Sequence, residues 1–116
     1  RLAAGGKHQT LDHYLSEAGG EVVLEEEDLG GGLTQPVKRN LLSRSEVVLV
    51  AVPKDFVGVL SRSREAAVKW RVESRIVLSH YIRRGYVVVD IATGGRKYYY
   101  VLWKGGFDKA LRGELP

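Results

Sequence analysis

The 116-residue sequence contains no cysteine and no methionine, and it has only one asparagine and two glutamines. Without cysteine the chain can form no disulfide, has no thiolate nucleophile and offers no thiolate ligand for zinc. The scarcity of heat-labile side chains, beside abundant Arg, Glu and Val, is typical of thermophilic proteins. No apolar run approaches the roughly 20 residues that span a bilayer, and no segment resembles a secretory signal. These absences predict a cytoplasmic protein that does not bind membranes.

Catalytic and metal-binding patterns are also missing. His8, His13 and His80 are scattered, and none belongs to an H-x-x-x-H or H-E-x-x-H pattern. The glycines at 30–32 lack the Lys-Ser/Thr pair that completes a phosphate-binding loop, and the carboxylates at 25–28 would repel phosphate. We therefore predict that the protein is not an enzyme and holds no metal and no cofactor.

The charge balance is basic. Lys and Arg outnumber Asp and Glu by 18 to 14, which gives a net charge of +4 and favours polyanionic partners. The hydrophobic content of 44% is enough for the core of one domain at this length. We predict a flexible lead over residues 1–9 and a single domain over residues 10–116.

The first third of the sequence predicts short elements. A capped helix is expected over residues 10–18, and a strand over 21–24 that leads through the acidic run to a turn at the glycines 30–32. Thr34 and Pro36 resemble the cap and first turn of a short helix.

The central part predicts a buried strand and a long helix. Residues 46–52 are almost all apolar and β-branched, which is typical of a central strand with both faces covered, and 53–60 can add one or two helical turns. Ser63 can cap a helix from about 64 to 84. One side of this helix carries Val68, Val72, Ile76 and Ile82, and the opposite side carries Trp70, Val77 and Tyr81. One apolar side can pack on the sheet, and the other needs a second cover, either another helix of the same chain or a second protomer. We predict a homo-oligomer formed through this helix.

The last third predicts a β-hairpin. Residues 86–91 and 96–103 are strand-like and are joined by a turn that contains two glycines, and 107–112 can form a final helical turn. The order of elements predicts an α+β fold. It should have about four mostly antiparallel strands, one long helix, two or three short helices and a C-terminal β-hairpin.

The second strand of this hairpin combines aromatic and basic residues. Alternation along the strand sends Tyr98, Tyr100 and Leu102 to one face and Tyr99, Val101 and Trp103 to the other. One face must cover the core, and the other would present rings beside cations, which suits a single strand whose bases stack while its phosphates meet the cations. The same rings can also be cross-strand packing, because Tyr and Trp are favoured in any strand.

These patterns predict non-catalytic binding of single-stranded DNA or RNA. The candidate nucleic-acid-binding residues of the hairpin are Arg96, Lys97, Tyr98, Tyr99, Tyr100, Trp103 and Lys104. A second group on the long helix comprises Arg71, Arg75, Arg83 and Arg84, which can equally be a solvated rim.

The order of elements and the basic aromatic hairpin resemble the archaeal ThermoDBP-related single-stranded nucleic-acid-binding proteins over residues 10–112. The resemblance implies an archaeal protein with a cleft between sheet and helix that clamps single-stranded DNA or RNA without cutting it. It also implies self-association.

Two other families are alternatives. The long helix, Gly85 and the hairpin resemble the recognition helix and wing of a winged-helix regulator that binds duplex DNA, although the helix leaves little polar surface for reading bases. The segment Tyr81-Ile-Arg-Arg-Gly-Tyr-Val-Val88 resembles the helix-to-strand passage of the archaeal tRNA-splicing endonuclease. The catalytic Tyr, His and Lys of that endonuclease cannot be placed in this sequence. The resemblance therefore implies a structural, non-catalytic subunit.

Residues 8–15, H-Q-T-L-D-H-Y-L, resemble the clamp-binding peptide of replication proteins. The spacing departs from that pattern, since Gln9 is one place too close to Leu11 and Leu15 replaces the second aromatic residue. The segment is either an ordinary amphipathic helix or the contact of an adaptor that binds a sliding clamp.

Overall fold

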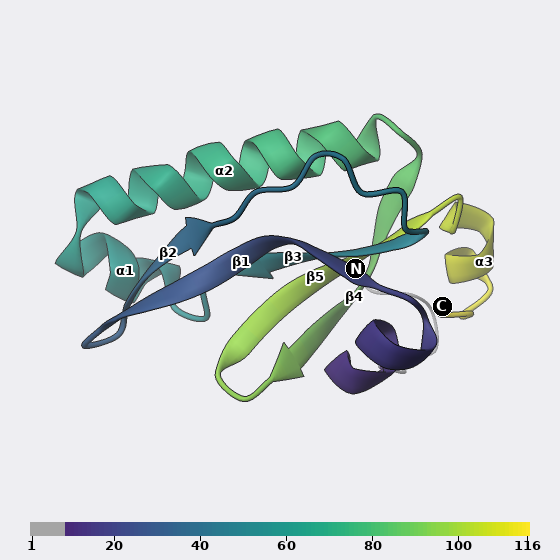
Figure 1. Ribbon diagram of the computed structural model, residues 1–116, viewed down its shortest axis with the longest axis horizontal. Coiled ribbons are helices and arrows are strands. Elements are labelled where there is room, and N and C mark those ends of the chain that lie inside the picture. Colours follow the sequence, from purple (N-terminus) through teal and green to yellow (C-terminus); the bar gives the residue numbers. More distant parts are fainter. Residues whose placement is uncertain (1–8) are drawn as a thin grey trace.

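The computed structural model describes residues 9–116, and within them five strands form one sheet in the order β2–β1–β3–β5–β4 (Figure 1). The strands are β1 (Glu21–Gly30), β2 (Leu33–Val37), β3 (Val47–Val52), β4 (Tyr86–Gly94) and β5 (Lys97–Lys104). The helices are α1 (Phe56–Arg62), α2 (Arg64–Ile82), α3 (Phe107–Leu111) and a short π-helical segment, η1 (His13–Glu17). Neighbouring strands are antiparallel except β1 and β3, which are parallel. The predicted α+β class is confirmed, with one strand more than expected.

The central strand is β3, as its sequence predicts. Four consecutive side chains, from Val48 to Ala51, have no exposed surface, so both faces of the strand are covered. It pairs in parallel with β1 on one side and antiparallel with β5 on the other. The long helix and the N-terminal segment provide the two covers.

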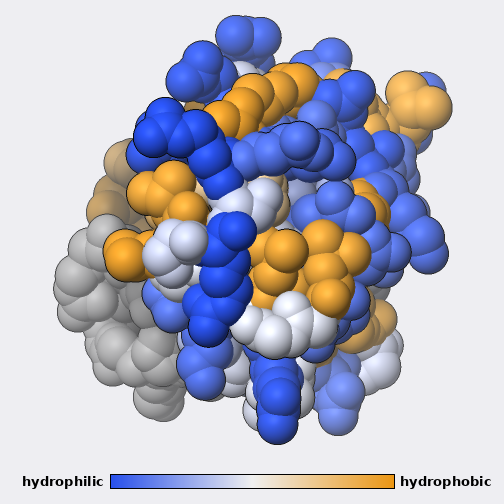
Figure 2. Space-filling model, turned by 90° about the vertical axis from the view of Figure 1, so that its left-hand side faces the viewer, coloured by the Kyte–Doolittle hydropathy of each residue, from blue (hydrophilic) through white to orange (hydrophobic). Residues whose placement is uncertain are grey.

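The long helix α2 covers one face of the sheet (Figure 1). It begins where predicted, because Oγ of Ser63 accepts a hydrogen bond of 3.1 Å from the backbone of Ala66. Trp70, Val77 and Tyr81 form its buried side. The opposite apolar side remains outside, where Val68, Val72 and Ile82 are 52%, 46% and 52% exposed. Figure 2 shows hydrophobic surface between hydrophilic side chains along its upper edge, where α2 lies.

The N-terminal helix covers the other face. Tyr14 has no exposed surface, and Gly20 allows its close approach to the sheet. A Cβ added at Gly20 would lie 2.6 Å from the carbonyl oxygen of Tyr14 and 2.8 Å from Cδ1 of Leu49. The described part of the predicted clamp-binding segment is therefore packed on the sheet through its aromatic residue, and His8 lies outside the described residues.

The segment around Thr34 and Pro36 is a strand, so the prediction of a helix start there is wrong. β2 pairs with the acidic run of β1, with Thr34 opposite Asp28 and Pro36 opposite Glu26. The two strands are joined by glycines whose φ angles are 91°, 62° and 82° at positions 30, 31 and 32. Glycine adopts such positive φ angles without steric strain. β1 continues to Gly30, well beyond the end of the strand predicted over residues 21–24.

None of the helices within residues 9–116 is both long and apolar enough to cross a membrane. The predicted lead at residues 1–9 lies almost wholly outside the described residues. Only Gln9 belongs to the described part, where its backbone N–H donates a hydrogen bond to the Asp90 carboxylate.

Candidate nucleic-acid interface

The aromatic rings of β5 are divided between the two faces of the sheet, in the alternation expected for a strand. Tyr99 pairs with Ala51 of β3 and Ala92 of β4, and it is 7% exposed. Burial raises the pKa of its hydroxyl. Tyr99 is therefore part of the core in this structure and offers no ring face on which a base can stack.

The other rings of β5 are half-buried. The ring of Trp103 is covered by the start of α3, since a Cβ added at Gly106 would lie 2.6 Å from it and Nζ of Lys109 is 5.3 Å from its centroid. Tyr98 and Tyr100 point to the opposite face of the sheet and are also partly covered. We expected one face of this strand to be open, but α2 lies over one face of the sheet and η1 over the other. The structure does not bring these rings together as one exposed platform.

The cations predicted on the hairpin lie in two separate places. Arg96 and Lys97 line a hollow beside Glu26 and Asp28, whereas Lys104 lies at the other end of β5. On the long helix, the guanidinium of Arg71 lies 5.3 Å above the ring of Phe56 in α1. That contact is a cation–π interaction within the fold.

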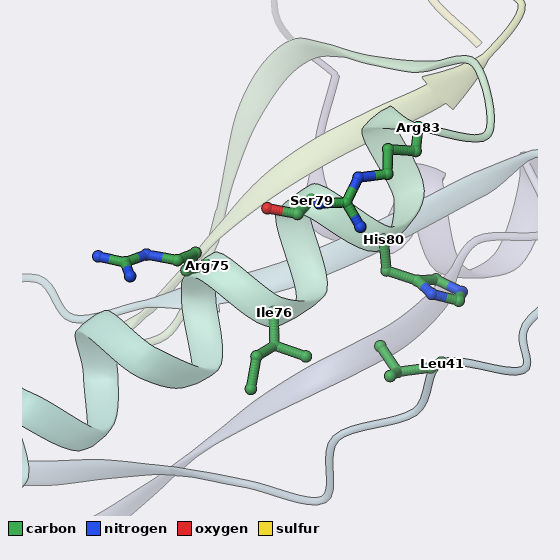
Figure 3. A pocket seen from close by; sticks show the side chains of 6 residues that line it. All are labelled: Leu41, Arg75, Ile76, Ser79, His80 and Arg83. Carbon is green, nitrogen blue, oxygen red and sulfur yellow. The ribbon is translucent and has the colours of Figure 1, made fainter.

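Two of the arginines predicted on the long helix, Arg75 and Arg83, line a hollow of about 380 Å³ near its C-terminal end (Figure 3). Its lining residues are Leu41, Arg75, Ile76, Ser79, His80 and Arg83. Figure 3 shows Leu41 reaching from the loop toward Ile76 and His80, while Arg83 folds back over Ser79. Arg75 extends outward from the helix, so its guanidinium is accessible to a ligand.

A second hollow, of about 560 Å³, adjoins the first and shares Leu41 and His80 with it. Its other lining residues are Leu42, Ser43, Arg44, Arg84, Tyr86 and Lys104. Within the described chain, neither hollow is lined by an Asp or a Glu. We call the five cations of these two hollows the basic end: Arg44, Arg75, Arg83, Arg84 and Lys104.

Two tyrosines hold the loop that carries Arg44. The hydroxyl of Tyr81 donates a hydrogen bond of 2.8 Å to the carbonyl oxygen of Asn40 and accepts one of 3.3 Å from the backbone of Ser43. The hydroxyl of Tyr86 donates to the carbonyl oxygen of Ser45. The two rings meet edge to face with centroids 5.1 Å apart. Burial raises the pKa of both hydroxyls, so they remain protonated donors at neutral pH.

A contact between two turns brings Lys104 to the arginines of α2. The backbone N–H of Gly105 donates a hydrogen bond of 2.9 Å to the carbonyl oxygen of Gly85. One guanidinium nitrogen of Arg84 donates to the carbonyl oxygen of His80, which caps the end of the helix. Among residues 9–116, none of the five cations of the basic end is ion-paired. Their charges are therefore available to an external anion.

Sequence reasoning missed Arg44. Its loop follows β2 in a segment without helical or strand periodicity, and its position depends on tyrosines about 40 residues further along the chain. Phe107, the exposed aromatic residue that follows Lys104 at the start of α3, was also outside the predicted site, and it is 59% exposed.

Comparison with protein-family models, curated proteins and solved structures gave no match.

Proposed function

We propose that the protein binds single-stranded nucleic acid, without making or breaking a bond, through the basic end. The observation that carries this proposal is the pair of adjoining hollows lined by five cations that form no ion pair within residues 9–116. When such a surface binds a phosphate backbone, counterions are released from the nucleic acid. Their release supplies most of the affinity of a protein that does not read base sequence.

The preference for a single strand rests on Phe107. The bond between Gly105 and Gly85 places Phe107, three residues after Lys104, at the same end of the molecule as Arg84. An unpaired base stacked on an exposed ring contributes about 1–3 kcal/mol, and the bases of a duplex are not available for such stacking. Phe107 thus takes the role that sequence reasoning gave to the tyrosines of β5.

Two features argue against duplex reading by α2. Its inner side is occupied by Trp70 and Tyr81, which are buried against the sheet. Its outer side presents Val68 and Val72, which offer no hydrogen bonds to base edges in a major groove. The arginines at its C-terminal end suit phosphate contacts, which carry no sequence information.

The test is fluorescence anisotropy of labelled single-stranded DNA, single-stranded RNA and duplex DNA of equal length at two salt concentrations. We expect the single strands to bind more tightly than the duplex and more weakly at high salt. Arg75→Glu together with Arg83→Glu should weaken binding by at least about tenfold. The matched control is Lys38→Glu with Arg64→Glu, which changes the net charge equally at exposed positions outside both hollows.

A preference for duplex DNA would contradict the single-strand proposal and favour the winged-helix alternative. Absence of binding to all three would favour a protein-interaction or structural subunit, such as the clamp adaptor or the endonuclease subunit. The cytoplasmic location and the homo-oligomer stay predictions.

A further inference from the structure

A third hollow, of about 490 Å³, lies at the other end of α2, between the β1–β2 turn, the start of α1 and the tip of the β4–β5 hairpin. The β1–β2 turn and α1 lie at the end of the molecule that faces the viewer in Figure 2. The lining residues are Glu26, Asp28, Gly31, Gly32, Thr34, Lys54, Asp55, Val59, Arg62, Arg96 and Lys97. Its size lies within the range of small-molecule sites.

The hollow contains two buried polar groups, the hydroxyl of Thr34 and the carboxyl group of Glu26. Oγ1 of Thr34 has no exposed surface and no hydrogen bond in the described chain. Glu26 is 9% exposed, and its carboxyl group lies near this hydroxyl, which is the neighbouring donor that lowers the pKa of Glu26 against the effect of burial. Because buried polar groups in folded proteins are nearly always bonded, the unsatisfied hydroxyl of Thr34 indicates an external partner in the hollow.

The other two carboxylates of the hollow are already used by the backbone. Oδ1 of Asp28 accepts a hydrogen bond of 2.7 Å from the N–H of Gly30, and Oδ1 of Asp55 accepts one of 2.9 Å from the N–H of Gly58. Glu26 is therefore the carboxyl group available to accept a donor from a ligand.

Four cations surround this acceptor pair: Lys54, Arg62, Arg96 and Lys97. The guanidinium of Arg62 lies against the glycine turn, since a Cβ added at Gly32 would lie 3.5 Å from its Cζ. One of its nitrogens donates to the carbonyl oxygen of Gly58, which fixes the guanidinium at the edge of the hollow. Cations outnumber carboxylates here by four to three, with two of the carboxylates engaged by backbone donors. The hollow thus combines an anion-binding rim with a buried acceptor and hydroxyl.

We propose that this hollow binds one nucleoside monophosphate unit, with its phosphate at the cationic rim and a neutral donor group of its sugar or base at Glu26 and Thr34. A carboxylate that accepts from a ribose hydroxyl or from the amino group of a base is a common mode of nucleotide recognition. The inference rests on the proposed function for the class of ligand, but it uses no residue of the basic end.

The test is a titration of the full chain, labelled with nitrogen-15, with adenosine 5′-monophosphate, deoxyadenosine 5′-monophosphate, ribose 5-phosphate and inorganic phosphate. We expect the two nucleotides to shift the amide signals of Gly31, Gly32 and Thr34, and to bind at least about tenfold more tightly than inorganic phosphate. Tighter binding of the ribonucleotide than of the deoxynucleotide assigns the donor to the 2′-hydroxyl, and equal binding assigns it to the base or to the 3′-hydroxyl. Ribose 5-phosphate binding as tightly as the ribonucleotide assigns it to the sugar.

Thr34→Val, which keeps the shape of the side chain and removes the hydroxyl, should weaken nucleotide binding by about tenfold or more, and Glu26→Gln should do so independently. The control is Thr93→Val, at an exposed position of β4 outside this hollow. Equal binding of inorganic phosphate and nucleotide, or unchanged affinity in both variants, would overturn the proposal. The Arg75→Glu, Arg83→Glu protein separates the two ideas, because it should lose strand binding and keep nucleotide binding.

Discussion

The hydroxyl of Tyr14 donates a hydrogen bond of 2.6 Å to Oδ2 of Asp90, and neither residue has any exposed surface. The same carboxylate accepts from the backbone of Gln9 at 3.1 Å and of Ile91 at 2.8 Å. This group therefore fastens the N-terminal helix to β4, across a sequence separation of 76 residues. Burial, together with the bond to Asp90, raises the pKa of Tyr14, which keeps its hydroxyl protonated.

Tyr14→Phe should lower the free energy of unfolding by about 1–3 kcal/mol, because the buried Asp90 carboxylate loses a donor that no water can replace without opening the core. The measurement is denaturant unfolding at constant pH. Tyr98→Phe is the control, since the Tyr98 hydroxyl has no hydrogen-bond partner among the described residues, and it should change stability by less than about 0.5 kcal/mol. Equal effects in the two variants would contradict an anchoring role for the Tyr14–Asp90 bond.

The pH dependence of stability should carry a contribution from Glu26. Burial raises the pKa of this carboxyl above 4.5, and the nearby Thr34 hydroxyl and Lys97 ammonium offset part of that rise. The folded protein then binds more protons than the unfolded chain at pH values just above 4.5, so stability falls as pH rises through this window. In Glu26→Gln this contribution is absent. Unfolding free energies at pH 4 and pH 7 should therefore show wild type losing stability relative to Glu26→Gln on going to pH 7, and a constant difference would refute the assignment.

The elements with their own periodicity could be predicted from the sequence. The continuous apolar run gave β3, and the Ser63 cap with the spacing of Trp70 and Val77 gave α2 and its buried side. β2 could not be predicted, because Thr34 and Pro36 satisfy the local rules for a helix start. Their strand conformation depends on pairing with β1 and on a bond from the indole N–H of Trp70 to the carbonyl oxygen of Thr34.

The site was harder to predict than the fold. Alternation correctly placed Tyr99 and Tyr100 on opposite faces of β5, but it carries no information on what covers each face. Tyr99 is in the core since the sheet is covered on both sides, and the cover on one side comes from the segment that contains Tyr14. Clustering along the sequence likewise joined Arg96 to Lys104, although Arg96 lies in the turn before β5 and Lys104 is the last residue of that strand.

The loop of Arg44 should loosen when its anchors are removed. Tyr81→Phe removes the donor to Asn40 and the acceptor for Ser43, so we expect stability to fall by about 1 kcal/mol and the amides of residues 41–45 to exchange hydrogen faster. Single-strand affinity should fall with it, because Arg44 is no longer held at the hollow. Unchanged exchange in 41–45 beside reduced affinity would show that Tyr81 acts in another way.

The salt dependence of single-strand binding should show how many phosphate contacts the cations of the basic end make. For single strands, the slope of log Kd against log salt concentration changes by about 0.7 for each phosphate contact. Arg44→Gln and Lys104→Gln should each reduce the slope by roughly this amount, and the double variant by about twice as much, if each cation meets one phosphate. Lys38→Gln, outside both hollows, should leave the slope unchanged. A slope that is equally steep in all these proteins would remove Arg44 and Lys104 from the interface.

We expect the protein to self-associate through the outer side of α2. The outer side of this helix exposes Val68, Val72 and Ile82 at spacings that form one stripe, and we expect a second copy to cover it. Light scattering at tens of micromolar protein should then give a mass of at least twice 12.9 kDa. Val72→Glu should yield a monomer, whereas Val57→Glu, at a 74% exposed position of α1, should not.

The salt dependence of self-association should be opposite to that of strand binding. Salt does not weaken apolar contact, and it screens the repulsion between the arginines of two helices. Self-association should therefore strengthen at the salt concentrations that weaken the binding of single strands. A monomeric mass for the wild-type protein at both low and high salt would refute this interface.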